Sequence, residues 1–169
     1  MAFDKPSGRK LKVLRSAFRY FATRFEHEVV LRGKEVYGVS AELLEILEKL
    51  KVDCYAGVKL GEVGRRLRLT LEGTFWLLGN DRKKVWVNEK GEMLFLYGRD
   101  IFTSSVERCS EFGENEVVFV CNRFGDVLGI GKSRFSSEKL AEVDPDRVFV
   151  ENLVDRGAYI RHERLYNAY

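Results

Sequence analysis

The chain has 169 residues, of which 45% are apolar and 33% charged, as in a globular protein; no run reaches the roughly 18 apolar residues that a membrane span needs. The start of the chain is also unlike a signal peptide, so we expect no membrane partner and a cytoplasmic location. The net charge is only +3, but residues 1–24 hold seven basic residues against one acidic residue, a local field that can bind a polyanion.

Residues 10–25 are predicted to form a helix, because apolar side chains recur at helical spacing. These apolar positions are Leu11, Leu14, Phe18, Phe21 and Phe25. Lys12, Arg15 and Arg19 form a second, basic stripe. The stripe is interpreted either as a solvated face or as a secondary contact for the phosphates of a polyanion.

Residues 29–39 are predicted to form a β-hairpin, because two apolar runs flank Arg32-Gly33-Lys34 and the glycine can adopt a positive φ at the turn. Ser40 then has the position of an N-cap for a helix over 41–50, whose first turns carry glutamates. These two elements indicate a mixed α/β region.

The next segment is predicted to be extended from residue 54 to residue 70 and to lead into a short helix that ends near Leu78. Strands are expected at 85–87 and 93–97, with a turn at 88–91 between them. A helix over 99–109 would complete an N-terminal domain of residues 1–110, because polar residues interrupt the pattern from 105 to 114.

Residues 111–169 are expected to form a small β-domain. Val117–Val120 and Val127–Gly131 are predicted to pair as a hairpin, and residues 157–163 to form a closing strand. Lys132 and Arg134 follow the second hairpin strand at alternate positions, so both should project from one face. Basic side chains on or beside the closing strand would extend this surface into an RNA-binding groove. They are Arg156, Arg161, His162 and Arg164.

The hairpin and the closing segment resemble a PUA domain, a small RNA-binding β-barrel. Phe95-Leu96-Tyr97-Gly98 and the run Gly157-Ala158-Tyr159-Ile160-Arg161-His162-Glu163 resemble, in order and spacing, the Nip-seven family of ribosome-assembly factors. The absence of glutamine beside abundant Glu, Lys and Arg suits an archaeal member of that family. The resemblance implies an α+β protein, with an N-terminal α/β domain packed on a C-terminal PUA-type β-barrel.

The same resemblance implies function. It implies a non-enzymatic protein that binds RNA, with a preference for single-stranded or uridine-rich tracts, and acts in ribosomal RNA processing or large-subunit assembly. Its partners would then be pre-ribosomal or ribosomal RNA and other assembly or RNA-processing proteins. In this family the residues that bind RNA would include Arg161 and His162, whereas Lys132 and Arg134 are inferred from strand geometry.

Enzymatic functions find little support in the sequence. The cysteines lack C-x-x-C spacing, Gly131-Lys132-Ser133 lacks the upstream glycine of a phosphate-binding loop, and no serine has a placed base. We therefore expect no catalytic residue, no metal and no cofactor, and a monomer. The alternative function is that of a protein-interaction adaptor in an RNA-processing or RNA-decay complex, in which the PUA domain is structural.

Overall fold

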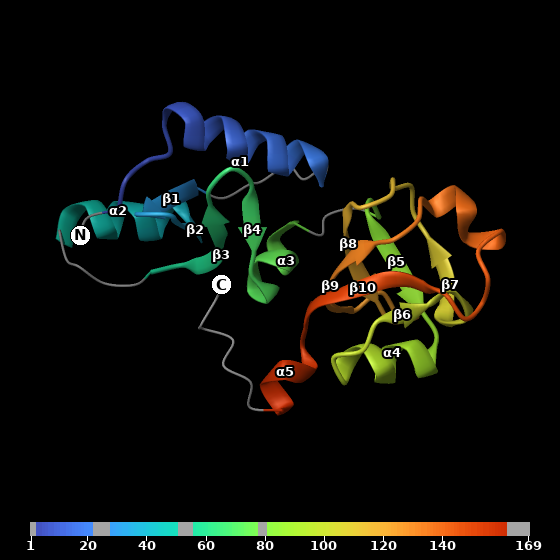
Figure 1. Cartoon of the computed structure of the whole chain (residues 1–169). Helices are drawn as coiled ribbons and strands as arrows, with labels where there is room; N and C mark the ends of the chain where they lie inside the picture. The colour runs from blue at the N-terminus through green and yellow to red at the C-terminus, as the bar shows by residue number, and fades with distance from the viewer. Residues whose placement is uncertain (1–2, 22–27, 51–55, 78–80, 162–169) are drawn as a thin grey trace. The chain divides into compact units, whose positions relative to one another are not determined.

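The computed structural model describes residues 3–21, 28–50, 56–77 and 81–161, and it divides the chain into two compact units, Met1–Asn80 and Asp81–Tyr169 (Figure 1). This division falls about thirty residues before the boundary predicted at 110/111. The sheet of the second unit explains the difference, because strands that precede residue 110 belong to it. None of the described helices is long and apolar enough to cross a membrane.

The first unit contains a four-stranded antiparallel sheet whose strands follow the order of the chain, β1-β2-β3-β4. The strands are β1 Glu28–Arg32, β2 Glu35–Val39, β3 Val58–Val63 and β4 Leu67–Leu69. Gly33 has a φ of 63° in the turn between β1 and β2, which confirms the predicted hairpin and the reason for its glycine.

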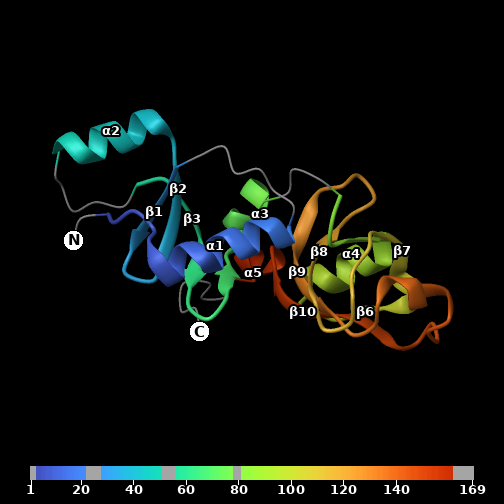
Figure 2. The ribbon, with the colours of Figure 1, turned by 90° about the horizontal axis from the view of Figure 1, so that it is seen from above.

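Helices cover both faces of this sheet. α1 (Gly8–Tyr20) and α3 (Leu71–Leu77) pack on one face, around the buried Leu60, and α2 (Ala41–Leu50) packs on the other, beside Tyr37. Figure 2 shows the strands between α1 and α2. The Ser40 hydroxyl accepts a hydrogen bond from the Leu43 amide at 3.2 Å, as expected of the predicted N-cap. The predicted end of the first helix, Phe25, lies outside the described residues.

The second unit contains a six-stranded sheet of order β6-β10-β9-β8-β5-β7. The strands are β5 Lys84–Val87, β6 Ile101–Phe102, β7 Val106–Cys109, β8 Val117–Cys121, β9 Val127–Ser133 and β10 Val148–Asp155. β5 runs parallel to β8, whereas the other neighbours are antiparallel. β8 and β9 confirm the predicted C-terminal hairpin.

Two helices replace segments that the sequence analysis predicted to be extended. The predicted turn at 88–91 and strand at 93–97 form α4 (Glu89–Leu96), and the predicted closing strand at 157–163 begins with α5 (Gly157–Ile160). α4 begins at Asn88, whose side chain accepts a hydrogen bond from the Gly91 amide at 2.9 Å. The apolar run at 93–97 is short, and a short run does not distinguish a strand from a buried helix. In the structure it belongs to a helix that buries Phe95 in the core.

The predicted helix over 99–109 is also wrong. The segment forms β6, the 3-10 turn η1 (Thr103–Ser105) and β7, because Ile101 and Phe102 pair with β10 and residues 106–109 pair with β5. These partners lie far along the sequence, so local periodicity did not reveal them. A second 3-10 turn, η2 (Ser137–Ala141), connects β9 to the segment before β10.

Glycines allow β9 to lie against its neighbours. A Cβ atom on Gly129 would lie 2.2 Å from the Val154 carbonyl oxygen, and one on Gly131 would lie 2.3 Å from a Val150 methyl group. The two glycines noted in this strand therefore serve close packing between strands.

Candidate nucleic-acid interface

Lys132 and Arg134 lie at the C-terminal end of β9, beside Glu151 of β10. Lys132 is opposite Glu151 in the strand register, and the Arg134 Nη2 atom lies 3.2 Å from the Glu151 Oε2 atom. The three side chains therefore share one face of the sheet, as the alternation of the sequence predicts for the two cations. Lys132 is half-buried, whereas Arg134 is exposed.

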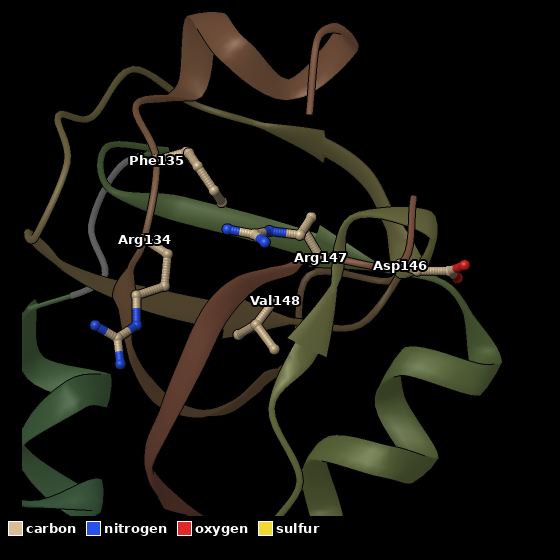
Figure 3. Close-up of a pocket in the computed structure, with 5 residues that line it drawn as sticks. All are labelled: Arg134, Phe135, Asp146, Arg147 and Val148. Carbon is tan, nitrogen blue, oxygen red and sulfur yellow. The ribbon is translucent and has the colours of Figure 1, made fainter. Parts of the chain in front are cut away.

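An open pocket of about 510 Å³ adjoins this end of the sheet, lined by Arg134, Phe135, Asp146, Arg147 and Val148 (Figure 3). The Arg147 side chain extends toward the segment that carries Arg134 and Phe135, whereas Asp146 points away from both arginines. The Arg147 guanidinium thus lies toward the half-buried Phe135 ring, whereas the Arg134 side chain extends away from that ring (Figure 3). Arginine forks bind phosphate oxygens in a bidentate manner, and an aromatic face can stack an unpaired base.

The pocket is held by backbone hydrogen bonds and an aromatic stack. The Arg147 carbonyl oxygen accepts from the Thr103 amide at 2.9 Å and from the Thr103 hydroxyl at 3.1 Å, and the Arg134 amide donates to the Phe149 carbonyl at 2.9 Å. Phe135 stacks on Phe149 with ring centroids 6.1 Å apart. Both arginines therefore project from anchored backbone, which reduces the ordering cost of binding a ligand.

Arg147 is the residue that the sequence analysis missed. It ends the turn Asp144-Pro145-Asp146-Arg147, in which the Asp144 carboxylate accepts a hydrogen bond from the Asp146 amide at 2.8 Å. An Asp-Pro turn directly before the apolar run of β10 was a usable signal, because such a turn places its last residue at the start of a strand.

At the other end of β10, Arg161 makes an ion pair within the fold. The Arg161 guanidinium makes two contacts with the Asp155 carboxylate, at 3.1 and 3.2 Å, and also donates to the Leu96 carbonyl oxygen. The Asp155 side chain is only 5% exposed. Arg161 therefore ties α5 to α4 and β10, a structural role that the sequence analysis did not predict.

The six predicted contact residues are consequently not all brought together. Arg156 is half-buried beside Arg161, at the end of β10 where Asp155 is opposite Gly129. Arg134 lies beyond the opposite end of the same strand pair, roughly 15–20 Å away at about 3.3 Å per residue. His162 and Arg164 lie outside the described residues. Of the predicted contact residues that the structure describes, Arg134 thus lines the pocket, whereas Arg161 forms an ion pair with Asp155.

The basic stripe of the first unit has the geometry predicted for it. Lys12, Arg15 and Arg19 are all exposed on α1, whereas Leu14 is buried at 1% exposure on the side that faces the sheet. The helix thus presents a cationic face on one side and an apolar face on the other.

The described cysteines do not offer a reactive thiolate. Burial raises the pKa of Cys121 to about 11, with a smaller opposing effect of Lys84, and burial also raises the pKa of Cys109. A thiol with such a pKa is protonated at neutral pH and is a poor nucleophile. The third cysteine, Cys54, lies outside the described residues.

Comparisons with known families match both parts of the chain. The model described as UPF0113 PUA domain matches residues 83–164, and the model described as NIP7/UPF0113, pre-PUA domain matches residues 7–71. These matches confirm the predicted fold class, α+β with a PUA-type second domain.

Relatives are similar over most of their length. A UPF0113 protein of Archaeoglobus fulgidus is 59% identical over 172 residues, covering 98% of each chain. A 60S ribosome subunit biogenesis protein NIP7 homolog of Rattus norvegicus is 30% identical over 138 residues, covering 79% of this chain and 77% of the relative.

Solved structures show the same fold at low identity. A conserved PUA domain protein from Thermoplasma acidophilum superposes with a TM-score of 0.63 at 15% identity, covering 95% of this chain and 97% of that one. A PUA domain from Aeropyrum pernix superposes with a TM-score of 0.58 at 12% identity, covering 90% and 85%.

Proposed function

Because the chain belongs to the NIP7/UPF0113 family, we propose that it is a non-enzymatic RNA-binding protein that acts in ribosomal RNA processing and assembly of the large ribosomal subunit. It works as a monomer in the cytoplasm, and its partners are pre-ribosomal or ribosomal RNA and other assembly proteins. The NIP7 homologs are named as 60S ribosome subunit biogenesis proteins, which supports a role in subunit assembly. The match to a PUA domain supports RNA as the ligand.

The observation that carries the proposal is the pocket lined by Arg134, Phe135 and Arg147, with Lys132 on the same face of β9 as Arg134. The arginines bind phosphate oxygens, and Phe135 offers an apolar surface for a base. Glu151, paired with Arg134, accepts hydrogen bonds and so suits the donor groups of a base edge. This mixture of charges fits a base together with the backbone phosphates of a short strand better than it fits a long polyphosphate.

The pocket favours single-stranded RNA over a duplex. Bases inside a duplex are stacked on their neighbours, so only an unpaired base can enter a pocket lined by an aromatic ring. The preference for uridine-rich tracts is proposed from the family resemblance. Backbone contacts by Arg156, His162 and Arg164 are proposed to flank the pocket, with Arg161 excluded because of its ion pair with Asp155.

A salt titration of RNA binding tests this function. With three phosphates neutralised, the slope of about −0.7 per phosphate predicts an affinity loss of roughly 20-fold for a single-stranded oligouridine between 50 and 200 mM salt. The variant Lys132→Ala/Arg134→Ala/Arg147→Ala should lose most of that slope, whereas Lys139→Ala, an exposed cation on η2, should retain it. An affinity that does not change with salt would refute the proposed mechanism.

A protein-interaction adaptor is the second candidate, and one feature of the second unit favours it. α4 and α5 expose large apolar side chains: Met93 is 55% exposed, Tyr97 69% and Ile160 80%. Exposed apolar clusters mark protein interfaces more often than solvated surface. Capture of assembly proteins that survives nuclease treatment, together with no affinity for naked RNA, would favour the adaptor over the RNA-binding protein.

A further inference from the structure

α1 has a charge pattern that opposes its own stability. Its thirteen residues include five basic side chains and no acidic one. Lys12, Arg15 and Arg19 are spaced by three and four residues, so like charges are neighbours on the helix surface, which destabilises a helix. Arg9 and Lys10 lie in the first turn, where the helix dipole is positive, and the N-cap residue makes no side-chain hydrogen bond there.

Some cations elsewhere in the described residues have acidic partners, whereas others, such as Arg65 and Arg147, make no ion pair there. Lys59 lies 2.6 Å from Glu35, Lys83 lies 2.6 Å from Glu116, and comparable pairs engage Lys84 and Arg161. Across the described ranges, by contrast, no ion pair joins Lys12, Arg15 or Arg19 to an acidic side chain. Arg19 lies favourably in the last turn of α1, near the negative end of the helix dipole, but the fold supplies no acidic partner that would offset the repulsion among the three cations.

The apolar face of α1 limits what can bind its basic face. A basic amphipathic helix often inserts into a membrane surface or a partner groove through its apolar side. Here that side is occupied, because Leu14 is 1% exposed and packs with Leu31, Val36 and Leu60 of the sheet. Figures 1 and 2 show α1 lying along this sheet. Only the cationic face is available, and its chemistry fits a polyanion.

We infer that α1 is a second RNA contact, in which Lys12, Arg15 and Arg19 bind successive backbone phosphates without reading the sequence. The inference rests on the proposed function, because it takes RNA as the polyanion. From Lys12 to Arg19 the helix rises by seven steps of about 1.5 Å, or about 10 Å, which matches about three phosphate spacings of a stacked strand. The repulsion among these three cations, which destabilises α1, is then explained by their role in binding RNA.

The test uses the full-length chain with the variant Lys12→Gln/Arg15→Gln/Arg19→Gln and a single-stranded RNA long enough to reach more than one site. The log–log salt slope should become shallower by about 2, and affinity at 50 mM salt should fall on the order of 10-fold or more. The melting temperature should not fall, since like charges are removed. Lys5→Gln is the matched control, because Lys5 is exposed in the same unit but pairs with Glu48 at 3.5 Å.

Several outcomes would overturn the inference. The first is a salt slope that is the same in the α1 glutamine variant and the parent chain. The second is a loss of RNA affinity in Lys5→Gln that equals the loss in the α1 variant. The third is an α1 variant that binds RNA normally but no longer binds polyglutamate, which would indicate an acidic protein partner. If the glutamine variant melts at a lower temperature, Lys12→Arg/Arg15→Lys/Arg19→Lys decides: retained RNA affinity supports a phosphate contact, and lost affinity contradicts it.

The two proposals fail in different ways. If the pocket variant Lys132→Ala/Arg134→Ala/Arg147→Ala binds RNA normally while the α1 variant does not, the proposed PUA contact is refuted and α1 stands. The opposite result refutes the α1 contact alone.

Discussion

The two ends of the β9–β10 strand pair carry arginines with opposite roles. At one end Arg161 is bound to the nearly buried carboxylate of Asp155 and to the Leu96 carbonyl. At the other end Arg134 and Arg147 are exposed and line a pocket. Arg134 makes an ion pair with Glu151, but this pair lies at the surface. The difference shows that the acid which the fold places beside an arginine decides whether its guanidinium is held inside the structure, as for Arg161, or stays at the surface, as for Arg134.

The largest expected effect concerns the structural end, at Gly157. A Cβ atom there would lie 1.7 Å from the Leu96 carbonyl oxygen. Gly157→Ala should therefore displace α5 and lower the free energy of unfolding by about 3 kcal/mol or more. Chemical denaturation measures this change. Gly113→Ala, whose Cβ would approach only the Glu116 side chain at 3.5 Å, serves as the control, and equal stability of the two variants would contradict the packing of α5 on α4.

Removal of the ion pair itself should have the next largest effect. Arg161→Ala leaves the Asp155 carboxylate buried without its partner, so the free energy of unfolding should fall by about 2–3 kcal/mol. RNA affinity, measured under conditions where the variant is folded, should not change. A variant that is as stable as the parent chain but weaker in RNA binding would return Arg161 to the binding surface.

The binding end should respond in the opposite way. Arg147→Ala keeps the backbone carbonyl that accepts from Thr103, so the turn and the melting temperature should be retained. Affinity for a single-stranded oligouridine should fall roughly 5-fold to 10-fold, or about 1–1.4 kcal/mol, because one charged hydrogen-bonding group is lost. Fluorescence anisotropy measures this affinity. A loss of stability without a loss of affinity would make Arg147 a structural residue like Arg161.

The smallest effect lies in the first unit, where Lys59 pairs with Glu35. The hydrogen bond from Lys59 lowers the pKa of Glu35 against the opposing effect of burial, and Tyr37 adds a further hydrogen bond. A lowered carboxylate pKa gives stability that is present above the unfolded value of 4.5 and is lost as the pH falls through the folded value.

Lys59→Gln should reduce this acid-side loss, which we expect to be below about 1 kcal/mol for a pair near the surface. Unfolding free energies measured between pH 5 and pH 3 give the comparison. An identical pH dependence in the variant and the parent chain would show that the pair contributes no pH-dependent stability.

Local signals predicted the elements whose partners are near in sequence. The hairpin around Gly33, the helix after Ser40 and the β8–β9 hairpin all follow from a turn glycine, a capping hydroxyl or alternation within about fifteen residues. Each of these signals acts within a short segment, and the tertiary contacts of the fold favour the same local structure.

Elements with distant partners were predicted wrongly. Residues 101–109 are strands because β10 and β5 pair with them, and 89–96 is a helix because Phe95 packs under the sheet. The candidate site shows the same limit. The sequence indicated Lys132 and Arg134 from strand alternation, but the acid that engages Arg161 and the turn that positions Arg147 depend on the fold.

The parallel pairing of β5 with β8 sets the order in which a nascent chain can acquire its structure. Each strand of the first unit joins one that precedes it closely, so that sheet is complete once residue 69 has left the ribosome. β5, in contrast, can pair with β8 only after residues 117–121 have been synthesised. β6 can pair only after synthesis of β10, which begins at Val148. During translation the first unit can therefore fold with its cationic helix in place, whereas the PUA sheet requires synthesis of nearly the whole polypeptide.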